Sequence, residues 1–402
     1  MTVHDFDVVI VGGGLVGCSL ACALAPLGLR VGLVDQPLGR AQGLAQDQRK
    51  LALAAASVRA LSALDVMPRL KTAPTAIRRI HVSRQGDLGA VRLQASEFGR
   101  EDLGAVVLAG DLGAALQATV AALPQNVRSR EGRATLLEGA DDRRRLRIES
   151  PQGDEVWNTA LLVAADGTVS PLRQALGIGA EVFDYAQTLI VTSLRTSQPP
   201  DGTAFERFTD TGPCALLPMA GGRYGALCGV ATDDAERVLA LHAADYAAFF
   251  QQRFGWRAGR VLEVGERFAW PLRRIVAERV VAERAVLMGN AAQTIHPIGA
   301  QGFNLGLRDA LTLADVLGER GGDAGAPSTL TEYEGRRRED REQTLAFSDG
   351  LARMTRGTTF LHHLGRSVGL LAMSLDSGLR AQLAAGAMGY RGRVPRLAKE
   401  PA

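Results

Sequence analysis

The chain has 402 residues, of which 46% are hydrophobic and 22% charged, and its net charge is +3 at pH 7. This composition is that of an ordinary folded protein with two or three domains, and the small charge excludes a strong polyanion partner such as nucleic acid. The four cysteines form neither a C-x-x-C pair nor a cluster with metal-ligand spacing, so we expect no metal site and a reducing, cytoplasmic location. Cys18 and Cys22 stand four residues apart, where we expect small core residues of a helix.

The first predicted elements form a nucleotide-binding unit. Residues 8–11 are a short apolar run, as expected of a buried parallel strand, and residues 15–27 and 30–34 follow as a helix and a second strand. Between the first strand and the helix lies a G-x-G-x-x-G loop. This order predicts a dinucleotide site, with glycines close to a pyrophosphate and an acid on a ribose hydroxyl. The residues concerned are Gly12, Gly14, Gly17 and Asp35.

The same segment has two alternative interpretations. Residues 8–29 carry no charge, which also suits a membrane-spanning helix or a signal peptide. Three consecutive glycines interrupt that run, however, and Asp5 and Asp7 precede it where a signal peptide has positive charge. A structural βα unit without a nucleotide is the second alternative.

Strands dominate the middle of the chain. A helical stretch reaches residue 64, further helices are expected at residues 112–123 and 243–254, and strands at 77–82, 90–93, 128–138, 145–149, 161–165, 188–194, 214–218, 224–230, 261–268 and 285–289. The early nucleotide unit and the late buried strand bracket a β-rich insertion, so we expect a discontinuous domain. The predicted divisions are 1–75, 100–178 and 280–345 for the nucleotide-binding domain, 76–99 and 179–279 for the β-rich substrate domain, and 346–402 for a C-terminal helical region with a loose tail.

Residues 289–309 form a glycine-rich loop that leads into a helix. Gly289, Gly299, Gly302 and Gly306 allow the backbone to turn and to approach a flat or anionic ligand. From Phe303 onward, apolar residues recur at helical spacing. A loop that feeds a helix N-terminus presents free N–H groups and the positive end of the helix dipole. Such a site suits a ligand that develops negative charge, and a reduced flavin ring is one such ligand.

Three motifs together resemble a known family. The loop at residues 12–17, AADGTVSPLR at residues 164–173 and the stretch 289–309 occur in the order found in class A flavin-dependent aromatic hydroxylases, and the resemblance covers nearly the whole chain. Asn290, Gln293 and Ala300 depart from the usual Asp, His and Gly of that family. With these departures, GNAAQT-x-HP, QGFNLG-x-RD and DQRKLALA resemble most closely the ubiquinone-biosynthesis hydroxylases.

This resemblance implies an α/β fold with a Rossmann-like FAD-binding domain of the p-hydroxybenzoate hydroxylase type, an inserted β-rich substrate domain and a C-terminal helical region. It implies FAD as cofactor, NADPH or NADH and O₂ as co-substrates, and 2-polyprenyl-6-methoxyphenol as the substrate, hydroxylated through a flavin C4a-hydroperoxide. Besides the fingerprint, the implied FAD-binding residues are Arg49, Asp166, Gly167, Gly289, Asn290, Ala300, Gln301, Gly302, Phe303 and Asn304. Backbone amides of residues 301–304 should stabilise negative charge on the flavin, and Pro297 and Gly299 should form a water-poor surface at its reactive edge.

Three further candidates each keep two interpretations. His296 is a candidate catalytic base, because a phenol must become phenolate-like to react, or else a structural residue of its loop. Gln187 contacts the substrate or is a polar residue of the sheet. Residues 270–272, Trp-Pro-Leu, line the substrate pocket or pack where the domains meet.

The C-terminal region mixes apolar and basic residues. Between residues 351 and 402 the acids are Asp376 and Glu400, against eight arginines and lysines. We expect peripheral contact with the cytoplasmic membrane, where a polyprenyl substrate resides, or else a helical cap or a homo-oligomer interface. Delivery of substrate by a ubiquinone-biosynthesis protein complex is a further expectation. The alternatives for the whole chain are a sibling hydroxylase acting at another ring position or on a soluble aromatic, and a non-enzymatic flavin-binding redox protein.

Overall fold

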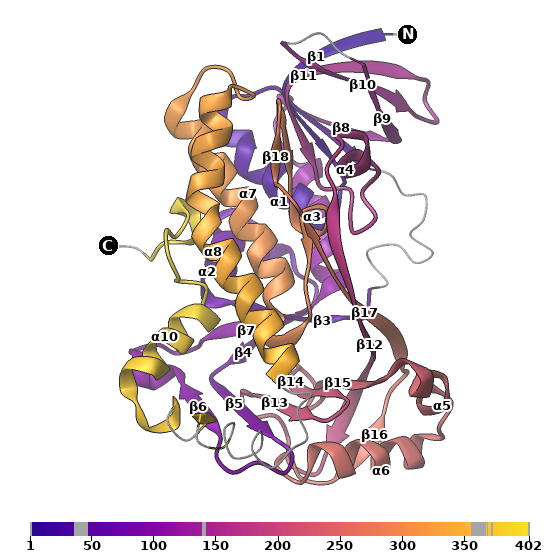
Figure 1. The fold of residues 1–402 in the computed structure, drawn as a ribbon, viewed down its shortest axis with the longest axis vertical. Helices are drawn as coiled ribbons and strands as arrows, with labels where there is room; N and C mark the ends of the chain where they lie inside the picture. The colour runs from indigo at the N-terminus through magenta and orange to yellow at the C-terminus, as the bar shows by residue number, and fades with distance from the viewer. Residues whose placement is uncertain are drawn as a thin grey trace.

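The computed structural model describes residues 2–35, 47–138, 142–354, 367, 369–370 and 373–400. Figure 1 shows an elongated molecule with one sheet in its upper half and a second sheet in its lower half. Two long helices, α7 (Gln301–Arg320) and α8 (Pro327–Met354), run side by side from the upper half toward the lower sheet. The two halves are therefore joined by continuous elements and not by a linker.

The first sheet has a parallel centre. Its strands follow the order β18-β19-β11-β1-β2-β8, and β1 pairs in parallel with both β2 and β11. The carboxyl ends of β1 and β11 therefore lie at the same edge, where open α/β sheets bind their ligands. The strands of this sheet are β1 (Thr2–Val11), β2 (Val31–Asp35), β8 (Val127–Glu131), β9 (Arg133–Leu137), β10 (Arg144–Glu149), β11 (Glu155–Ala164), β18 (Val281–Ala282) and β19 (Ala285–Leu287).

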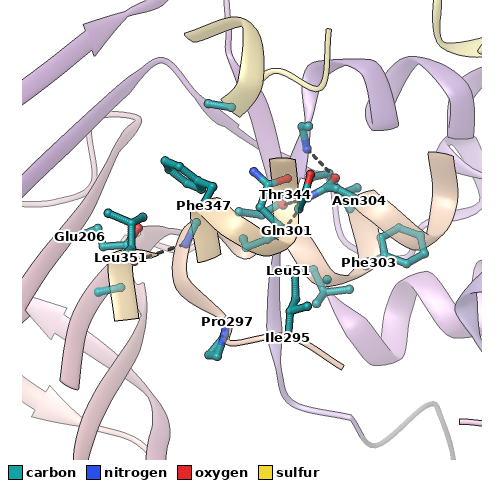
Figure 2. Close-up of a pocket in the computed structure, with 18 of the residues that line it drawn as sticks. Leu51, Glu206, Ile295, Pro297, Gln301, Phe303, Asn304, Thr344, Phe347 and Leu351 are labelled. Carbon is teal, nitrogen blue, oxygen red and sulfur yellow. Dashed lines mark hydrogen bonds between the residues drawn. The ribbon is translucent and has the colours of Figure 1, made fainter. Parts of the chain in front are cut away.

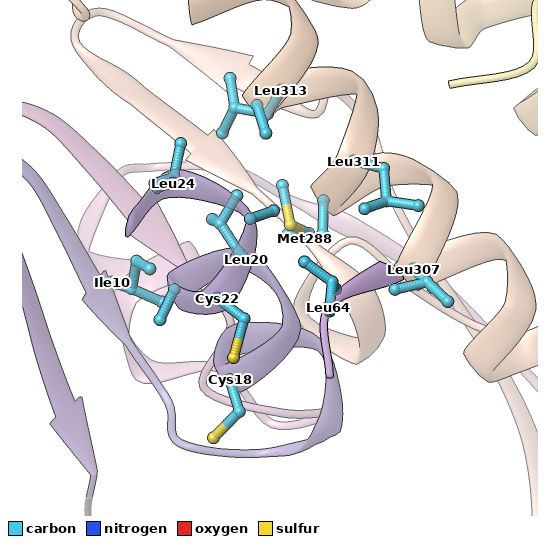
Figure 3. Packing of buried hydrophobic residues seen from close by; sticks show 14 of the residues in the cluster. Ile10, Cys18, Leu20, Cys22, Leu24, Leu64, Met288, Leu307, Leu311 and Leu313 are labelled. Atoms are coloured by element: carbon cyan, nitrogen blue, oxygen red, sulfur yellow. The ribbon is translucent and has the colours of Figure 1, made fainter. Parts of the chain in front are cut away.

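The main hydrophobic core packs helices against this sheet. Leu20 and Leu24 on α1 lie against the apolar face of α7, which presents Leu307 and Leu311 (Figure 3). A fully buried leucine contributes roughly 1.5–3 kcal/mol through loss of apolar surface to water. Cys18 and Cys22 are buried in the same core, as predicted. The shorter helices of this half are α1 (Leu15–Leu24), α2 (Ala55–Ala63), α3 (Ala109–Ala121) and α4 (Pro171–Ala175).

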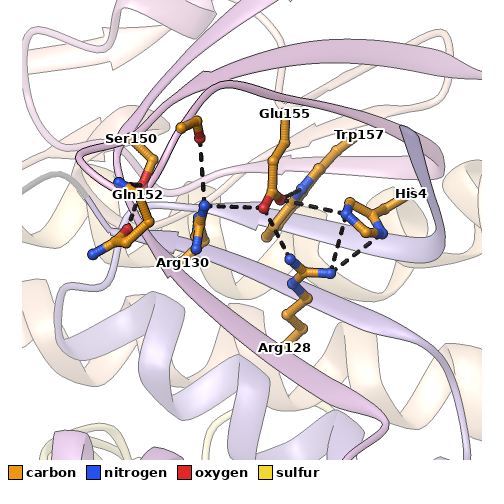
Figure 4. Close-up of polar contacts among 8 residues, drawn as sticks. His4, Arg128, Arg130, Ser150, Gln152, Glu155 and Trp157 are labelled. Atoms are coloured by element: carbon orange, nitrogen blue, oxygen red, sulfur yellow. Dashed lines mark hydrogen bonds and ion pairs between the residues drawn. The ribbon is translucent and has the colours of Figure 1, made fainter. Parts of the chain in front are cut away.

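A buried carboxylate ties together the N-terminal ends of this sheet (Figure 4). Glu155 on β11 accepts hydrogen bonds from Arg128 at 2.9 Å and from the indole nitrogen of Trp157 at 2.7 Å, and it pairs with Arg130 at 3.0 Å. Because each charge has a partner, the group can be buried without leaving an unpaired ion. This cluster lies at the opposite end of β1 from the glycine loop and serves the fold.

The second sheet carries the β-rich half. Its order is β20-β17-β12-β15-β14-β13-β5-β6, with β16 added on β12, so segments 79–94 and 180–277 share one sheet. The helix α6 (Ala243–Phe254) covers one face with Tyr246, Phe250 and Phe254. The strands are β5 (Arg79–Arg84), β6 (Val91–Gln94), β12 (Ala180–Thr196), β13 (Thr203–Thr209), β14 (Gly212–Pro218), β15 (Tyr224–Ala231), β16 (Val261–Val264), β17 (Phe268–Ala277) and β20 (Gln293–Thr294), and a short helix α5 (Ala235–Leu239) follows β15.

A small third sheet lies between the two halves. It has the order β3-β7-β4 and is antiparallel throughout. Its strands are β3 (Lys50–Ala54), β4 (Thr75–Ile77) and β7 (Gly104–Leu108). The domain divisions expected at residues 75–100 fall within or beside this sheet, and the boundaries themselves remain predictions.

Several expected elements differ from the structure. The strand expected over 128–138 is broken at Gly132, where a Cβ would lie 2.6 Å from the carbonyl oxygen of Glu149, and its halves pair with different strands as β8 and β9. The strand expected over 261–268 ends at Val264, and β17 starts only at Phe268. The strand β13 was not predicted. The charge cluster at residues 141–145 predicts a turn between two strands; Arg144 already belongs to β10, and Asp141 lies outside the described residues.

The expectation of a loose C-terminal tail is wrong. Ala398 is buried in the main core beside α2, and the backbone N–H of Arg396 donates to Asp315 on α7 at 2.8 Å. Arg100 forms an ion pair with Glu400. The basic composition of the tail suggested a solvated segment, but arginines also reach carboxylates on a neighbouring helix. The helix α10 (Ser377–Ala387) precedes this docked tail.

Buried ion pairs join α7 to α8. Arg337 lies 2.7 Å from Asp309 and 2.7 Å from Asp340, and Arg308 binds the same Asp340 at 2.7 Å. All four side chains are at most 6% exposed. Burial alone would raise the pKa of Asp340, but Arg308 and Arg337 outweigh it and hold that pKa below its usual value. These charges fix the register of the two helices.

Candidate active site

One large cavity lies where the two halves meet the start of α7 (Figure 2). Its volume is about 1050 Å³. This exceeds the roughly 300–1,000 Å³ typical of sites for one small molecule. Each of the three sequence motifs contributes to its wall, through Gly14–Val16, Gly167–Val169 and Gly299–Asn304 among others. The fold thus brings together three segments that are more than 100 residues apart in the chain.

In the fingerprint loop, Gly12 and Gly17 allow close backbone packing, whereas Gly14 is open to the cavity. A Cβ at Gly17 would overlap the carbonyl oxygen of Gly12, and one at Gly12 would overlap that of Ala165. A Cβ at Gly14 would meet nothing within 4 Å, because Gly14 faces the cavity. The carboxylate of Asp35 accepts the backbone N–H of Gly13 at 3.2 Å. Gly14 is therefore the member of the loop that a ligand can approach directly.

The Asp-Gly motif is held by its own polar contacts. Asp166 accepts hydrogen bonds from the Ser170 hydroxyl at 2.6 Å and from the backbone N–H of Leu172 at 3.0 Å. Burial, the largest cause, raises the pKa of Asp166, although these bonds oppose the shift. Arg173 donates to carbonyl oxygens at Thr168 and, at 2.9 Å, Ala291. Asp166 thus shapes the turn and Gly167 lines the cavity, while a direct role of Asp166 at FAD remains a prediction.

The start of α7 opens into the cavity. Ala300, at the N-cap, has no side-chain acceptor and adopts a left-handed φ of 51°. Gln301, Gly302 and Phe303 follow on the cavity wall. The first amides of a helix lack intrahelical partners, so this terminus offers N–H groups and the positive dipole end to a ligand. This geometry is what the expected stabilisation of negative charge requires.

Asn304 fixes that terminus to the small sheet. Its side-chain oxygen accepts the backbone N–H of Ala54 at 2.9 Å, and its side-chain nitrogen donates to Ala52 at 3.0 Å and Ala300 at 2.7 Å. Asn304 lines the cavity, but these three bonds to backbone groups occupy its amide. Its geometry is that of a positioning residue for β3 and α7.

Arg49 and the Trp-Pro-Leu segment form another part of the wall. The guanidinium of Arg49 lies 5.1 Å from the ring centre of Trp270 and pairs with Asp47. Trp270, Pro271 and Leu272 all line the cavity. This location favours the pocket interpretation of the segment. Gly289 and Asn290 line the cavity as well, whereas Gly306 approaches Val16 of α1 and serves helix packing.

Neighbouring residues of the loop before α7 face in different directions. Pro297 and Gly299 line the cavity, and Gly299 adopts a left-handed φ of 68°, which favours glycine. His296 is 1% exposed, and among the described residues it is not part of the cavity wall. Its Nδ1 accepts the backbone N–H of Ile298 at 3.3 Å, and its ring lies edge-on to Tyr185. These contacts support the structural interpretation of His296 over proton transfer.

Gln187 also lies away from the cavity. It is buried on β12 beside a shift in register, and it is absent from the described cavity wall. A Cβ at Gly212 would lie 3.6 Å from its side chain. The structure therefore favours a polar residue within the sheet over a substrate contact.

The cavity also holds a carboxylate that the sequence analysis missed. Glu206 on β13 lines the wall and accepts the backbone N–H of Gly299 at 3.4 Å, as the dashed line in Figure 2 shows. Burial raises the pKa of Glu206 to about 7. A strand of alternating pattern over residues 203–209 was the available signal, but an acid at such a position is usually read as solvent-facing.

Beyond this point the cavity becomes strongly apolar. Apolar residues between positions 77 and 103 and others from the C-terminal segment line this part, and most of them belong to one hydrophobic cluster; we call it the apolar lobe. It is lined by Ile77, Ile80, Val82, Val91, Leu93, Leu103, Leu370, Met373 and Leu383. The C-terminal segment is therefore a wall of the cavity.

Comparison with known proteins assigns the family. Residues 5–348 match the family model described as FAD binding domain. The chain is 35% identical over 387 residues to the ubiquinone hydroxylase UbiL of Rhodospirillum rubrum, covering 95% of this chain and 89% of the relative. It is 31% identical over 319 residues to the 3-demethoxyubiquinol 3-hydroxylase of Escherichia coli, covering 79% and 81%. The chain belongs to this family of FAD-dependent monooxygenases.

The fold of this monooxygenase is shared with solved hydroxylases. The p-nitrophenol 4-monooxygenase PnpA from Pseudomonas putida superposes with a TM-score of 0.78 at 17% identity, over 98% of this chain and 100% of that one. The predicted α/β fold of the p-hydroxybenzoate hydroxylase type is thereby confirmed. FAD with NAD(P)H is the cofactor system of such enzymes, and the open Gly14 backbone and the uncapped start of α7 fit it. The family assignment excludes the alternative of a non-enzymatic flavin-binding redox protein.

Two further findings concern metals and membranes. Within the described ranges, no group of three His, Cys, Asp or Glu side chains is placed to hold a metal ion. No helix in the same ranges is both long enough and apolar enough to cross a bilayer.

Proposed function

We propose that this monooxygenase hydroxylates the ring of a 2-polyprenylated phenol on the route to ubiquinone, and that 2-polyprenyl-6-methoxyphenol is its substrate. The named relatives act in ubiquinone chemistry. The observation that carries the proposal for this chain is the apolar lobe, which is continuous with the cavity at the start of α7. A phenol ring near α7 would leave its prenyl tail among aliphatic side chains.

The residues of the chain fit the demands of the reaction. Bound FAD, reduced by NAD(P)H, supplies the activated oxygen. The amides at the start of α7 favour negative charge on the bound ring system, and the open backbone at Gly14 receives its pyrophosphate. Pro297, Gly299 and the apolar walls exclude water, which otherwise diverts oxygen chemistry into hydrogen peroxide release.

The test compares two phenols that share a ring and differ in the tail. The purified protein with FAD is supplied with NADPH or NADH, and flavin bleaching and its return in air are followed by absorbance. The substrates are 2-methoxyphenol and a 2-methoxyphenol that carries a short prenyl chain at position 6, with products identified by mass spectrometry. We expect one added oxygen on the prenylated phenol and a kcat/KM at least about tenfold higher than for the tail-less one, since buried methylenes contribute about 0.8 kcal/mol each. Equal kcat/KM values would favour the sibling enzyme for soluble aromatics.

The site of oxidation is determined separately. Metabolites of a strain that lacks the gene should include the prenylated phenol that precedes the missing hydroxylation. Accumulation of a precursor that needs oxygen at another ring carbon would assign the chain to a sibling step.

The proposal includes collection of substrate at a membrane surface. Leu375 and Leu379 are exposed at the start of α10, close in sequence to the cavity-lining Met373 and to Arg380. An apolar patch beside a basic residue suits an anionic bilayer. The protein should pellet with liposomes that contain anionic lipid, and Leu375→Ser/Leu379→Ser should reduce that binding. No binding to either kind of liposome would favour delivery by a partner protein. Equal binding to neutral and anionic liposomes would show that the leucines, and not the basic charge, hold the protein at the membrane. Analytical ultracentrifugation would report self-association.

A further inference from the structure

The position of Glu206 follows from the alternation of β13. Successive strand residues face opposite sides, so the side chains of Ala204, Glu206 and Phe208 point to the cavity. Phe205, part of which also reaches the wall, packs against Tyr224 and Phe254. The alternation of β13 and the ring contacts of Phe205 thus direct the Glu206 side chain to the cavity.

The surroundings of Glu206 are almost wholly uncharged. Opposite it in the sheet stand Val82 on β5 and Ala215 on β14. Figure 2 places Phe347 and Leu351 of α8 on the same side of the cavity. On the face of β5 that carries Val82, the charged side chain is Arg84, which pairs with Asp210 and Asp87. This setting explains why burial raises the pKa of Glu206 to about 7.

The carboxylate has room to accept a further hydrogen bond. Its Oε1 receives the N–H of Gly299 at 3.4 Å, a long contact. For Oε2, no hydrogen bond is present within the described residues. The side chain is half-buried, so this second oxygen faces the cavity and can accept a hydrogen bond from a ligand there. Gly299 also joins the loop that leads to α7, so Glu206 stands between the flavin end of the cavity and its apolar part.

We propose that Glu206 is a catalytic residue that accepts the proton of the substrate's phenol hydroxyl. This inference rests on the proposed function, since it needs a phenol in the cavity. The O–H bond of the phenol breaks, its electron pair stays on the phenol oxygen, and the proton forms a new O–H bond on Glu206. The negative charge spreads into the ring and makes the ortho and para carbons nucleophilic. Oxygen enters the ring as a hydroxyl group, and the ring carbon then loses its C–H proton, which would pass to the second oxygen atom of O₂ and leave with it as water. Glu206 returns its proton to the phenol oxygen, so that protons balance.

Other groups of the cavity are less suited to this role. The other ionisable residues of the wall are Arg49, Lys50, Arg84, Arg273, Arg308, Asp340 and Arg391. The arginines are cationic and cannot accept a proton. Burial lowers the pKa of Lys50, but the stem of its side chain packs against Gly225 of β15. Asp340 is engaged by Arg308 and Arg337. His296 lies outside the described wall, with Nδ1 accepting from Ile298.

The first test compares two identical substitutions in the same half. Glu206→Gln keeps the shape and an acceptor for Gly299 but cannot take a proton. Glu236→Gln on α5 is the control, because Glu236 is exposed and lies outside the cavity. We expect kcat for hydroxylation of the prenylated methoxyphenol to fall about 100-fold in Glu206→Gln and to stay within twofold in the control. FAD affinity and flavin bleaching by NAD(P)H should stay within twofold in both, with oxygen diverted to hydrogen peroxide in Glu206→Gln.

A pH profile separates proton transfer from loop positioning. In the parent enzyme kcat should rise as pH increases through about 7, because Glu206 must be deprotonated to act. The groups facing it from β5, β14, the Gly299 loop and α8 are Val82, Ala215, Gly299, Phe347 and Leu351, none of which titrates. In Glu206→Gln, kcat should no longer rise as the pH increases through about 7. A ring-fluorinated phenol, which is more acidic and loses its proton more easily, should raise the kcat of this variant by at least about tenfold. Loosened FAD with full hydroxylation of bound phenol would overturn the proposal in favour of a positioning role.

A binding measurement keeps the inference testable without turnover. Titration of the oxidised holoenzyme with the prenylated methoxyphenol and with its O-methyl ether compares ligands that differ in the donated proton. We expect the phenol to bind at least about tenfold more tightly, and Glu206→Leu, which fits the apolar surroundings, to abolish that preference. A preference without any hydroxylation would refute the proposed function and keep the acceptor role of Glu206. No preference in the parent enzyme, or one that survives Glu206→Leu, would refute the acceptor role.

Discussion

At the scale of single residues, the backbone of Gly14 is open to the cavity. Gly14 lines the cavity, and a Cβ there would meet nothing within 4 Å of the protein. A side chain at this position therefore does not disturb the fold but fills the space next to a ligand. This separates Gly14 from Gly12 and Gly17, whose replacement would drive a Cβ into the backbone.

The first prediction uses that difference. Gly14→Val should weaken FAD binding by at least about 100-fold, because a branched side chain holds the pyrophosphate beyond hydrogen-bond distance of the loop amides. The melting temperature of the FAD-free protein should stay unchanged. Fluorescence titration with FAD measures the affinity, and Gly335→Val on the exposed side of α8 is the matched control. A Gly14→Val protein that purifies with full FAD would show that the pyrophosphate lies elsewhere.

At the scale of elements, the second prediction concerns the first turn of α7. Gly302 stands in the first turn on the cavity wall, and a Cβ there meets nothing within 4 Å. Gly302→Val should therefore leave the fold intact but push the flavin ring away from the amides of α7. We expect weaker FAD binding, or NAD(P)H oxidation that yields mainly hydrogen peroxide in place of hydroxylated product. Full coupling at an unchanged rate would mean that the ring does not rest on this turn.

The third prediction concerns the pairing of α7 with α8. Arg337→Met leaves Asp309 and Asp340 with one buried cation fewer, so the free energy of unfolding should fall by about 3–5 kcal/mol. Arg338→Met is the control: this neighbour is exposed, and the change should stay within about 0.5 kcal/mol. Urea denaturation measures both values.

The pH dependence of that loss has a definite sign. Asp340 has a depressed pKa in the folded protein, so it stabilises the fold above its unfolded pKa and loses that contribution as the pH falls through the folded value. The difference between the parent protein and Arg337→Met should therefore be largest near neutral pH and shrink below about pH 4. A difference that grows in acid would contradict the ion-pair account.

The same elements show what the sequence can predict. The glycine loop, the Asp-Gly turn and the start of α7 were predictable because their function depends on backbone geometry, which glycine spacing encodes locally. Glu206 was missed because a carboxylate that faces a cavity has the same strand pattern as one that faces water. The orientation of the His296 side chain could not be predicted either. Its contact with Tyr185 joins segments that are distant in the chain, and its hydrogen bond with Ile298 depends on the torsion angles of the loop. The docked tail depended on distant partners such as Asp315.

At the scale of the whole molecule, the C-terminal segment closes the cavity. Leu370, Met373 and Leu383 line the apolar lobe, and Ala398 is buried in the main core. Deletion of residues 367–402 should therefore open the lobe to water and expose part of the core. We expect a lower melting temperature, lower solubility and NAD(P)H oxidation that is largely uncoupled from hydroxylation. A truncated protein with normal coupling would show that the lobe does not hold the substrate.

The long strand β12 has a consequence for how the molecule melts. It spans 17 residues and pairs with β17 from Ala180 to Val191, and Figure 1 shows both strands running between the upper and lower halves. A shared ladder transmits the loss of order from one half to the other, unlike a flexible linker, across which domains melt independently. Calorimetry should accordingly record a single endotherm, and the parallel sheet and the apolar lobe would lose their order at one temperature.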